Sequence, residues 1–122
     1  MKFSTRVDIE VPVETAFAAL ADFPAFERAA MRRGAEVIRS NPTGTFKAGS
    51  SWSLRFTFRK KMRRVFCTLD PYDPPNGLGC RLDGSGFDGQ LDAGVIALSR
   101  NRSRMLVQLE IRPQSLKARL LI

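Results

Sequence analysis

Polar and apolar residues alternate along the start of the chain. Between residues 2 and 11 the even positions carry charged or hydroxyl side chains, and the odd positions hold Phe3, Thr5, Val7, Ile9 and Val11. A period of two is typical of a β-strand that buries one face. We therefore expect a strand at the start of the chain, which Pro12 ends.

Two short helices are expected next. A first helix can begin at Pro12, because a first turn needs no amide donor, and its apolar residues follow at helical spacing: Ala16, Phe17, Leu20 and Ala21. Asp22 can cap a second helix, and Gly34 can end that helix in the left-handed conformation. The apolar side of the second helix holds Phe23, Phe26 and Ala30.

Turn-forming residues divide the chain after Ala35 into six further strands, at the intervals of an antiparallel meander. One face of the third strand is strongly aromatic and holds Trp52, Leu54, Phe56 and Phe58. The last strand repeats the alternation with Met105, Val107, Leu109 and Ile111. The pattern of residues 90–99 is less regular, which predicts a β-bulge near Gly94.

An amphipathic helical pattern begins after Pro113 and stops at Ile122, with apolar positions at Leu116, Leu120 and Leu121. Because a helix of two turns covers little of a sheet, we expect a C-terminal helix that is cut short here. The predicted fold class is α+β: a curved, antiparallel, seven-stranded sheet with two short helices after the first strand. At 122 residues the chain has room for one hydrophobic core, so residues 1–122 are expected to form a single domain.

Composition narrows the function classes. The chain is 43% apolar and 26% charged, as in ordinary soluble proteins, and it lacks the apolar stretches of a signal peptide or a membrane span. A cytoplasmic location is therefore expected. A net charge of +8 favours anionic partners. Cys67 and Cys80 lack metal-ligand spacing and there is no histidine, so we interpret both as buried free thiols and expect neither metal nor cofactor.

Three segments together are similar to a known superfamily. They are residues 11–17, the stretch from Gly49 to Trp52, and the turn Tyr72-Asp73-Pro74-Pro75-Asn76-Gly77-Leu78 that follows Asp70. These segments resemble the START and Bet v 1-like (SRPBCC) superfamily, which includes polyketide cyclase and dehydrase-like proteins. The resemblance implies a helix-grip fold, in which a long C-terminal helix lies across a curved sheet and closes a ligand cavity.

A curved sheet with an aromatic inner face predicts a site for a hydrophobic or amphipathic small molecule, such as a lipid or polyketide-like compound. The candidate ligand-binding residues are Trp52, Phe56, Phe66, Phe87, Leu91 and Phe26. The alternative is that these side chains fill a solid core, as aromatic residues generally do. A face packed solid, with no cavity above roughly 300 Å³, would contradict the binding hypothesis.

Two other classes of function stay open. An acidic residue with Tyr72 could assist a cyclisation or dehydration, but without histidine no pair of residues has diagnostic spacing, so no catalytic residue is predicted. The basic run of residues 59–64 could dock on an anionic membrane surface, or it could be a solvated hairpin tip. A homodimer could close an open cavity. Nucleic acid is not expected as a partner, because the chain lacks an RNA-binding or helix-turn-helix signature.

Overall fold

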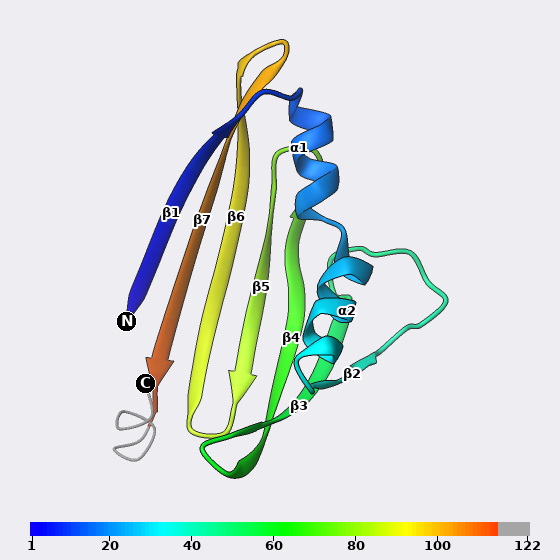
Figure 1. The fold of residues 1–122 in the computed structure, drawn as a ribbon, viewed down its shortest axis with the longest axis vertical. Helices are drawn as coiled ribbons and strands as arrows, with labels where there is room; N and C mark the ends of the chain where they lie inside the picture. Colours follow the sequence, from blue (N-terminus) through cyan, green and yellow to red (C-terminus); the bar gives the residue numbers. More distant parts are fainter. Residues whose placement is uncertain (115–122) are drawn as a thin grey trace.

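The structure, a computed structural model, describes residues 1–114. Two helices follow the first strand, and six strands complete the described chain (Figure 1). The elements are β1 (Lys2–Ile9), α1 (Val13–Leu20), α2 (Phe23–Arg32), β2 (Glu36–Arg39), β3 (Ser51–Phe58), β4 (Lys61–Asp73), β5 (Gly77–Gly84), β6 (Phe87–Ser99) and β7 (Arg102–Pro113). The predicted C-terminal helix lies outside the described residues.

All seven strands form one antiparallel sheet in the order β1-β7-β6-β5-β4-β3-β2. From β2 to β7 each strand pairs with the next along the chain, and β1 then pairs with β7 from Lys2↔Glu110 to Ile9↔Ser103. The prediction of an α+β fold with a seven-stranded meander and two short helices is confirmed. None of the described helices is long and apolar enough to cross a membrane.

Local signals in the sequence set the bounds of both helices. Pro12 precedes α1 in an extended conformation, and its carbonyl accepts the amide of Ala16 at 3.0 Å. The Asp22 side chain caps α2 by accepting the amide N–H of Ala25 at 3.3 Å. Gly34 follows α2 with φ of +94°, the left-handed conformation that glycine adopts without steric cost.

The two helices cover part of one face of the sheet, which we call the inner face (Figure 1). Phe17 of α1 and Phe23 of α2 are buried against it, and Leu69 of β4 is fully buried beneath them. The Phe23 ring lies 5.3 Å from the ring of Trp52 and 4.7 Å from that of Phe46, centroid to centroid. This aromatic cluster fixes α2 over β3.

The predicted bulge near Gly94 is wrong. Pairing between β6 and β7 runs without interruption from Ala93↔Val107 through Gly94↔Leu106, and the register shifts only between Ala97 and Ser99. The sequence pattern breaks because Ile96 lies exposed on the other face of the sheet, which needs no bulge.

Candidate functional site: an apolar pocket beneath helix α2

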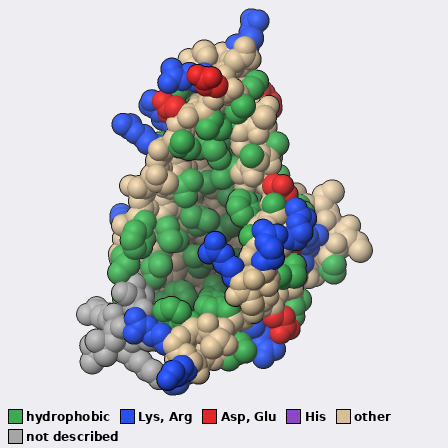
Figure 2. All heavy atoms as spheres, in the orientation of Figure 1, with side chains coloured by type: hydrophobic (Ala, Val, Ile, Leu, Met, Phe, Trp, Pro, Cys, Tyr) green, Lys and Arg blue, Asp and Glu red, His purple; other side chains and the backbone are tan. Residues whose placement is uncertain are grey.

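An apolar pocket lies between α2 and strands β2 to β6 on the inner face. Its volume is about 200 Å³ and it is partly open to solvent. Hydrophobic side chains gather in the hollow beside the helices, as Figure 2 shows. The lining residues are Phe23, Phe26, Glu27, Ala30, Val37, Trp52, Leu54, Cys67, Cys80 and Leu91.

Small side chains create this space. Ala30 lines the pocket from the helix, and Cys67 and Cys80 line it from the sheet. The strand register sets Cys67 directly beside Trp52 and Cys80 beside Leu91, so each thiol is flanked by a much larger apolar side chain. Larger residues at these three positions would fill the gap between α2 and the sheet.

Glu27 is the one ionisable side chain among the lining residues other than the two thiols, and it is held in place by two partners. Its Oε2 accepts hydrogen bonds from Nε of Arg39 at 2.9 Å and from Nε1 of Trp52 at 2.8 Å. Nη2 of Arg39 also contacts Oε1 of Glu27 in an ion pair. This network joins α2 to both β2 and β3 at the rim of the pocket.

The electrostatics of the lining follow from these contacts. The hydrogen bond from Arg39 lowers the pKa of Glu27 below its usual value, so the carboxylate stays charged and paired at neutral pH. Burial raises the pKa of Cys67 to about 11 and also raises the pKa of Cys80. Both thiols are therefore protonated and apolar in character at neutral pH, and neither forms a disulfide.

Three of the six predicted ligand-binding residues line the pocket: Trp52, Leu91 and Phe26. Trp52 is buried, whereas Phe26 is 56% exposed at the outer rim. Phe56 and Phe87 lie on the same inner face of the sheet, further along their strands, and are not in the pocket lining.

The prediction that Phe66 shares this face is wrong. Phe66 pairs with Ser53, while its neighbour Cys67 pairs with Trp52, so the Phe66 side chain points to the outer face. There its ring is 49% exposed, and the guanidinium of Arg64 lies 5.9 Å from the ring centroid.

The pocket by itself is smaller than the roughly 300 Å³ expected of a small-molecule site. The inner face is nevertheless not packed solid. Beyond the helices, Phe3 and Val7 of β1 are exposed on the inner face, in register with Leu109 and Met105 of β7. The pocket is therefore part of an open apolar surface rather than an enclosed cavity.

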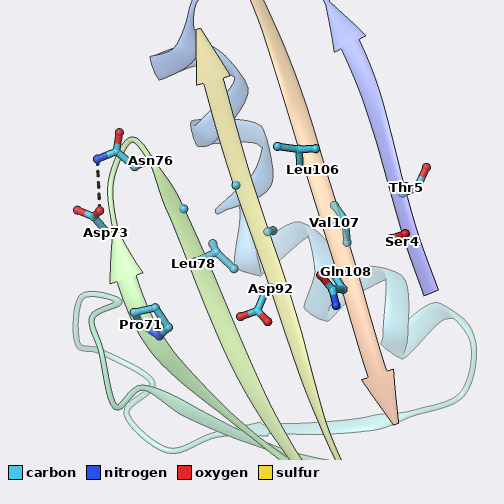
Figure 3. A pocket seen from close by; sticks show the side chains of 13 residues that line it. Ser4, Thr5, Pro71, Asp73, Asn76, Leu78, Asp92, Leu106, Val107 and Gln108 are labelled. Carbon is cyan, nitrogen blue, oxygen red and sulfur yellow. Dashed lines mark hydrogen bonds between the residues drawn. The ribbon is translucent and has the colours of Figure 1, made fainter. Parts of the chain in front are cut away.

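A second groove, of about 480 Å³, lies largely on the outer face of the sheet over β5, β6 and β7 (Figure 3). Its polar lining includes Asp92, Gln108 and Asn76, and Asn76 donates a hydrogen bond to Asp73 at 3.3 Å. This groove is larger but more polar, and neither of the two described helices closes it. We therefore take the pocket beneath α2 as the candidate site.

Comparison with protein families and with curated proteins finds no match in sequence. Solved structures do match in fold. Ara h 8.0201, a Bet v 1 homologue, has a TM-score of 0.67 at 12% identity, over 94% of this chain and 79% of its own. A START superfamily protein from Mycobacterium smegmatis has a TM-score of 0.66 at 14% identity, over 94% and 79%.

The aromatase/cyclase ZhuI from Streptomyces sp. R1128 has a TM-score of 0.67 at 11% identity, over 94% of this chain and 69% of its own. These likenesses confirm the helix-grip fold and, at the level of fold, the predicted resemblance to the START and Bet v 1-like proteins.

Proposed function

We propose that this protein binds a hydrophobic or amphipathic small molecule, such as a lipid or polyketide-like compound, in the pocket beneath α2. The observation that carries the proposal is the lining itself: its side chains are apolar apart from Glu27, whose carboxylate is already paired with Arg39 and Trp52. Such a lining gains free energy by removing apolar ligand surface from water, at about 25 cal/mol per Å².

The volume of the pocket restricts the ligand. A space of about 200 Å³ accepts one ring or a short stretch of alkyl chain. A longer amphiphile would place its tail between Trp52 and Leu91 and continue along the open inner face towards Leu109 and Phe3. Ligands with a single narrow apolar end should therefore bind better than broad, fused ring systems.

An enzyme acting through Tyr72 has weaker support. The Tyr72 ring packs 5.9 Å from Phe17 and 6.3 Å from Phe23, centroid to centroid, and Tyr72 is not among the residues that line the pocket. Glu27, which does line it, is paired and has a lowered pKa, so it is a poor proton donor near neutral pH. Ligand binding without chemistry is the function that we propose.

We also propose that the protein forms a homodimer and that it is located in the cytoplasm. A second copy that covered Phe3 and Val7 would enclose the open part of the inner face. Native mass spectrometry of the purified protein reports both the subunit count and any small molecule that is carried along. A monomer would remove the dimer from the proposal and leave the pocket unaffected.

The decisive experiment fills the pocket with a larger side chain on α2. Ala30→Leu should project into the space between α2 and the sheet and weaken binding of a fluorescent fatty-acid probe at least tenfold. Leucine is nearly as good a helix former as alanine, so the helix itself should tolerate the change. Ala19→Leu, at an exposed position of α1, is the matched control and should bind the probe as the wild type does.

Equal binding by Ala30→Leu and by the wild type would overturn the proposed site. Absence of probe binding to the wild type, together with a purified protein that carries no small molecule, would overturn the proposed function.

A further inference from the structure

The hairpin between β3 and β4 ends in a compact basic tip, which we define as residues 58–64. Five of its seven residues are cationic: Arg59, Lys60, Lys61, Arg63 and Arg64. The sequence contains no acidic residue between Ser51 and Leu69. In Figure 1 the tip lies at the end of the sheet opposite the start of α1, and Figure 2 shows Lys and Arg side chains at that end.

The turn itself is unfavourable for the residues that form it. Arg59 and Lys60 occupy the two central positions with φ of 52° and 64°. A two-residue turn of this kind strongly prefers Asn-Gly, because most other side chains are strained at positive φ. Two long cations at these positions weaken the turn, and strained residues that persist are a sign of a functional constraint.

The contacts of the three arginines of the tip do not neutralise their charge. The guanidinium of Arg59 lies 5.5 Å from the centroid of the Phe58 ring, that of Arg64 lies over Phe66, and Nε of Arg63 donates to the Phe58 carbonyl at 3.3 Å. Rings and carbonyl groups orient these side chains while leaving their positive charge available to an external anion.

Exposed apolar side chains lie among these charges. Phe58 is 44% exposed and Met62 is 62% exposed. The register pairs Phe58 with Lys61 and Thr57 with Met62, so the two apolar side chains lie on opposite faces of the hairpin. An apolar group on each face, surrounded by cations, matches the boundary of a bilayer, where phosphates lie directly above hydrocarbon.

We propose that the basic tip docks this protein on anionic lipid bilayers, with its cations at the headgroups and with Phe58 and Met62 inserted at the boundary with the acyl chains. Each Lys or Arg near such a surface strengthens binding about fivefold. A nucleic acid would also attract the positively charged tip. It has no hydrocarbon interior into which Met62 could insert, and Met62 is an aliphatic side chain that cannot stack on bases as an aromatic ring does.

Docking through the tip would place the open apolar surface close to the bilayer. The inner face of β3 carries Trp52, Leu54, Phe56 and Phe58 in succession, so one apolar stripe runs from the pocket to the tip. A role for this stripe in moving a lipid between the bilayer and the pocket rests on the proposed function. The docking itself does not depend on the pocket.

The test is co-sedimentation with phosphatidylcholine vesicles that contain or lack phosphatidylserine. The wild type should bind the anionic vesicles, bind the neutral vesicles weakly, and release as salt is raised. R59N/K60G converts the turn to its preferred residues and removes two charges, so it should weaken binding about tenfold to thirtyfold while folding at least as stably. R32A/R33A removes two charges at the end of α2 and should bind within about twofold of the wild type.

Met62→Ser should also weaken binding to anionic vesicles, although it changes no charge. Equal losses for R59N/K60G and R32A/R33A would mean that net charge alone attracts the vesicles and would overturn the proposal. If the wild type bound a DNA or RNA oligonucleotide more tightly than the vesicles, and R59N/K60G lost that binding, nucleic acid would replace the bilayer as the partner of the tip.

The docking proposal and the pocket proposal can fail separately. R59N/K60G should still bind the fatty-acid probe, and Ala30→Leu should still bind vesicles.

Discussion

The indole N–H of Trp52 donates a hydrogen bond to Oε2 of Glu27 at 2.8 Å, which ties the wall of the pocket on β3 to the helix that covers it. Arg39 of β2 donates to the same oxygen at 2.9 Å. Three elements therefore depend on one carboxylate for their relative positions. The shape of an apolar pocket is held here by a polar contact at its rim.

Replacing Glu27 by glutamine should destabilise the protein. The new amide would keep an oxygen that can accept from Trp52, but Arg39 would lose its charged partner. We expect the free energy of unfolding to fall by about 1.5–3 kcal/mol, the range for hydrogen bonds to charged groups. Urea denaturation measures the loss. Glu14→Gln, at an exposed position of α1, should change the stability little, and an equal loss in both variants would contradict this role of Glu27.

The contribution of Glu27 should depend on pH in a defined direction. Its pKa is lowered in the folded protein by the hydrogen bond from Arg39, so the unfolded chain takes up a proton first as the pH falls. The stability gap between the wild type and Glu27→Gln should thus be complete above the ordinary pKa of 4.5 and shrink as the pH falls through the folded value. Urea titrations from neutral to acidic pH test this, and a gap that widens in acid would contradict it.

The Cys67 thiol should react slowly in the folded protein. With its pKa raised to about 11, only about one thiol in a thousand is ionised at pH 8. Alkylation by iodoacetamide of the Cys80→Ser variant, followed by intact mass spectrometry, should accelerate almost tenfold for each unit of pH from neutral upwards. In denaturant the rate should rise sharply, because the pKa returns to about 8.5. Equal rates in folded and denatured protein would contradict the burial of this thiol.

Ser103 should matter more for stability than its small size suggests. It is fully buried, and its Oγ donates to the carbonyl of Val11 at 2.7 Å, joining β7 to the segment before α1. Ser103→Ala should lower the free energy of unfolding by about 1–2 kcal/mol, because the Val11 carbonyl loses its donor. Ser99→Ala, at an exposed position of β6, is the control, and thermal or urea denaturation measures both.

Local rules in the sequence are sufficient for most of the fold. Alternation identifies β1, β3 and β7, and the caps at Asp22 and Gly34 set the bounds of α2, because each rule depends on residues within one turn or one strand. The period-two rule also predicts the correct face for Phe66, because Phe66 and its neighbour Cys67 cannot face the same side of a strand. A prediction from aromatic character alone ignores that parity.

The candidate site is only partly predictable. Trp52, Leu91 and Phe26 stand out in the sequence because they are large and apolar, whereas the space between them is created by the small residues Ala30, Cys67 and Cys80. A pocket is an empty space between side chains, and no sequence motif marks such a space. Glu27 was missed because its partner Arg39 lies 12 residues away and Trp52 lies 25 residues away, and sequence alone does not state which acidic and basic residues meet.

The pairing of β1 with β7 sets a constraint on the order of folding. The terminal amino group of Met1 donates to the carbonyl of Ile111, 110 residues away along the chain, and the Met1 carbonyl accepts the amide of Ile111 in return. During synthesis β1 is made before the other strands, yet its only neighbour in the described sheet is the last of them. Its apolar residues Phe3 and Val7 must therefore wait until the whole meander has emerged, and closing this long loop is expected to be a slow and aggregation-prone stage of folding.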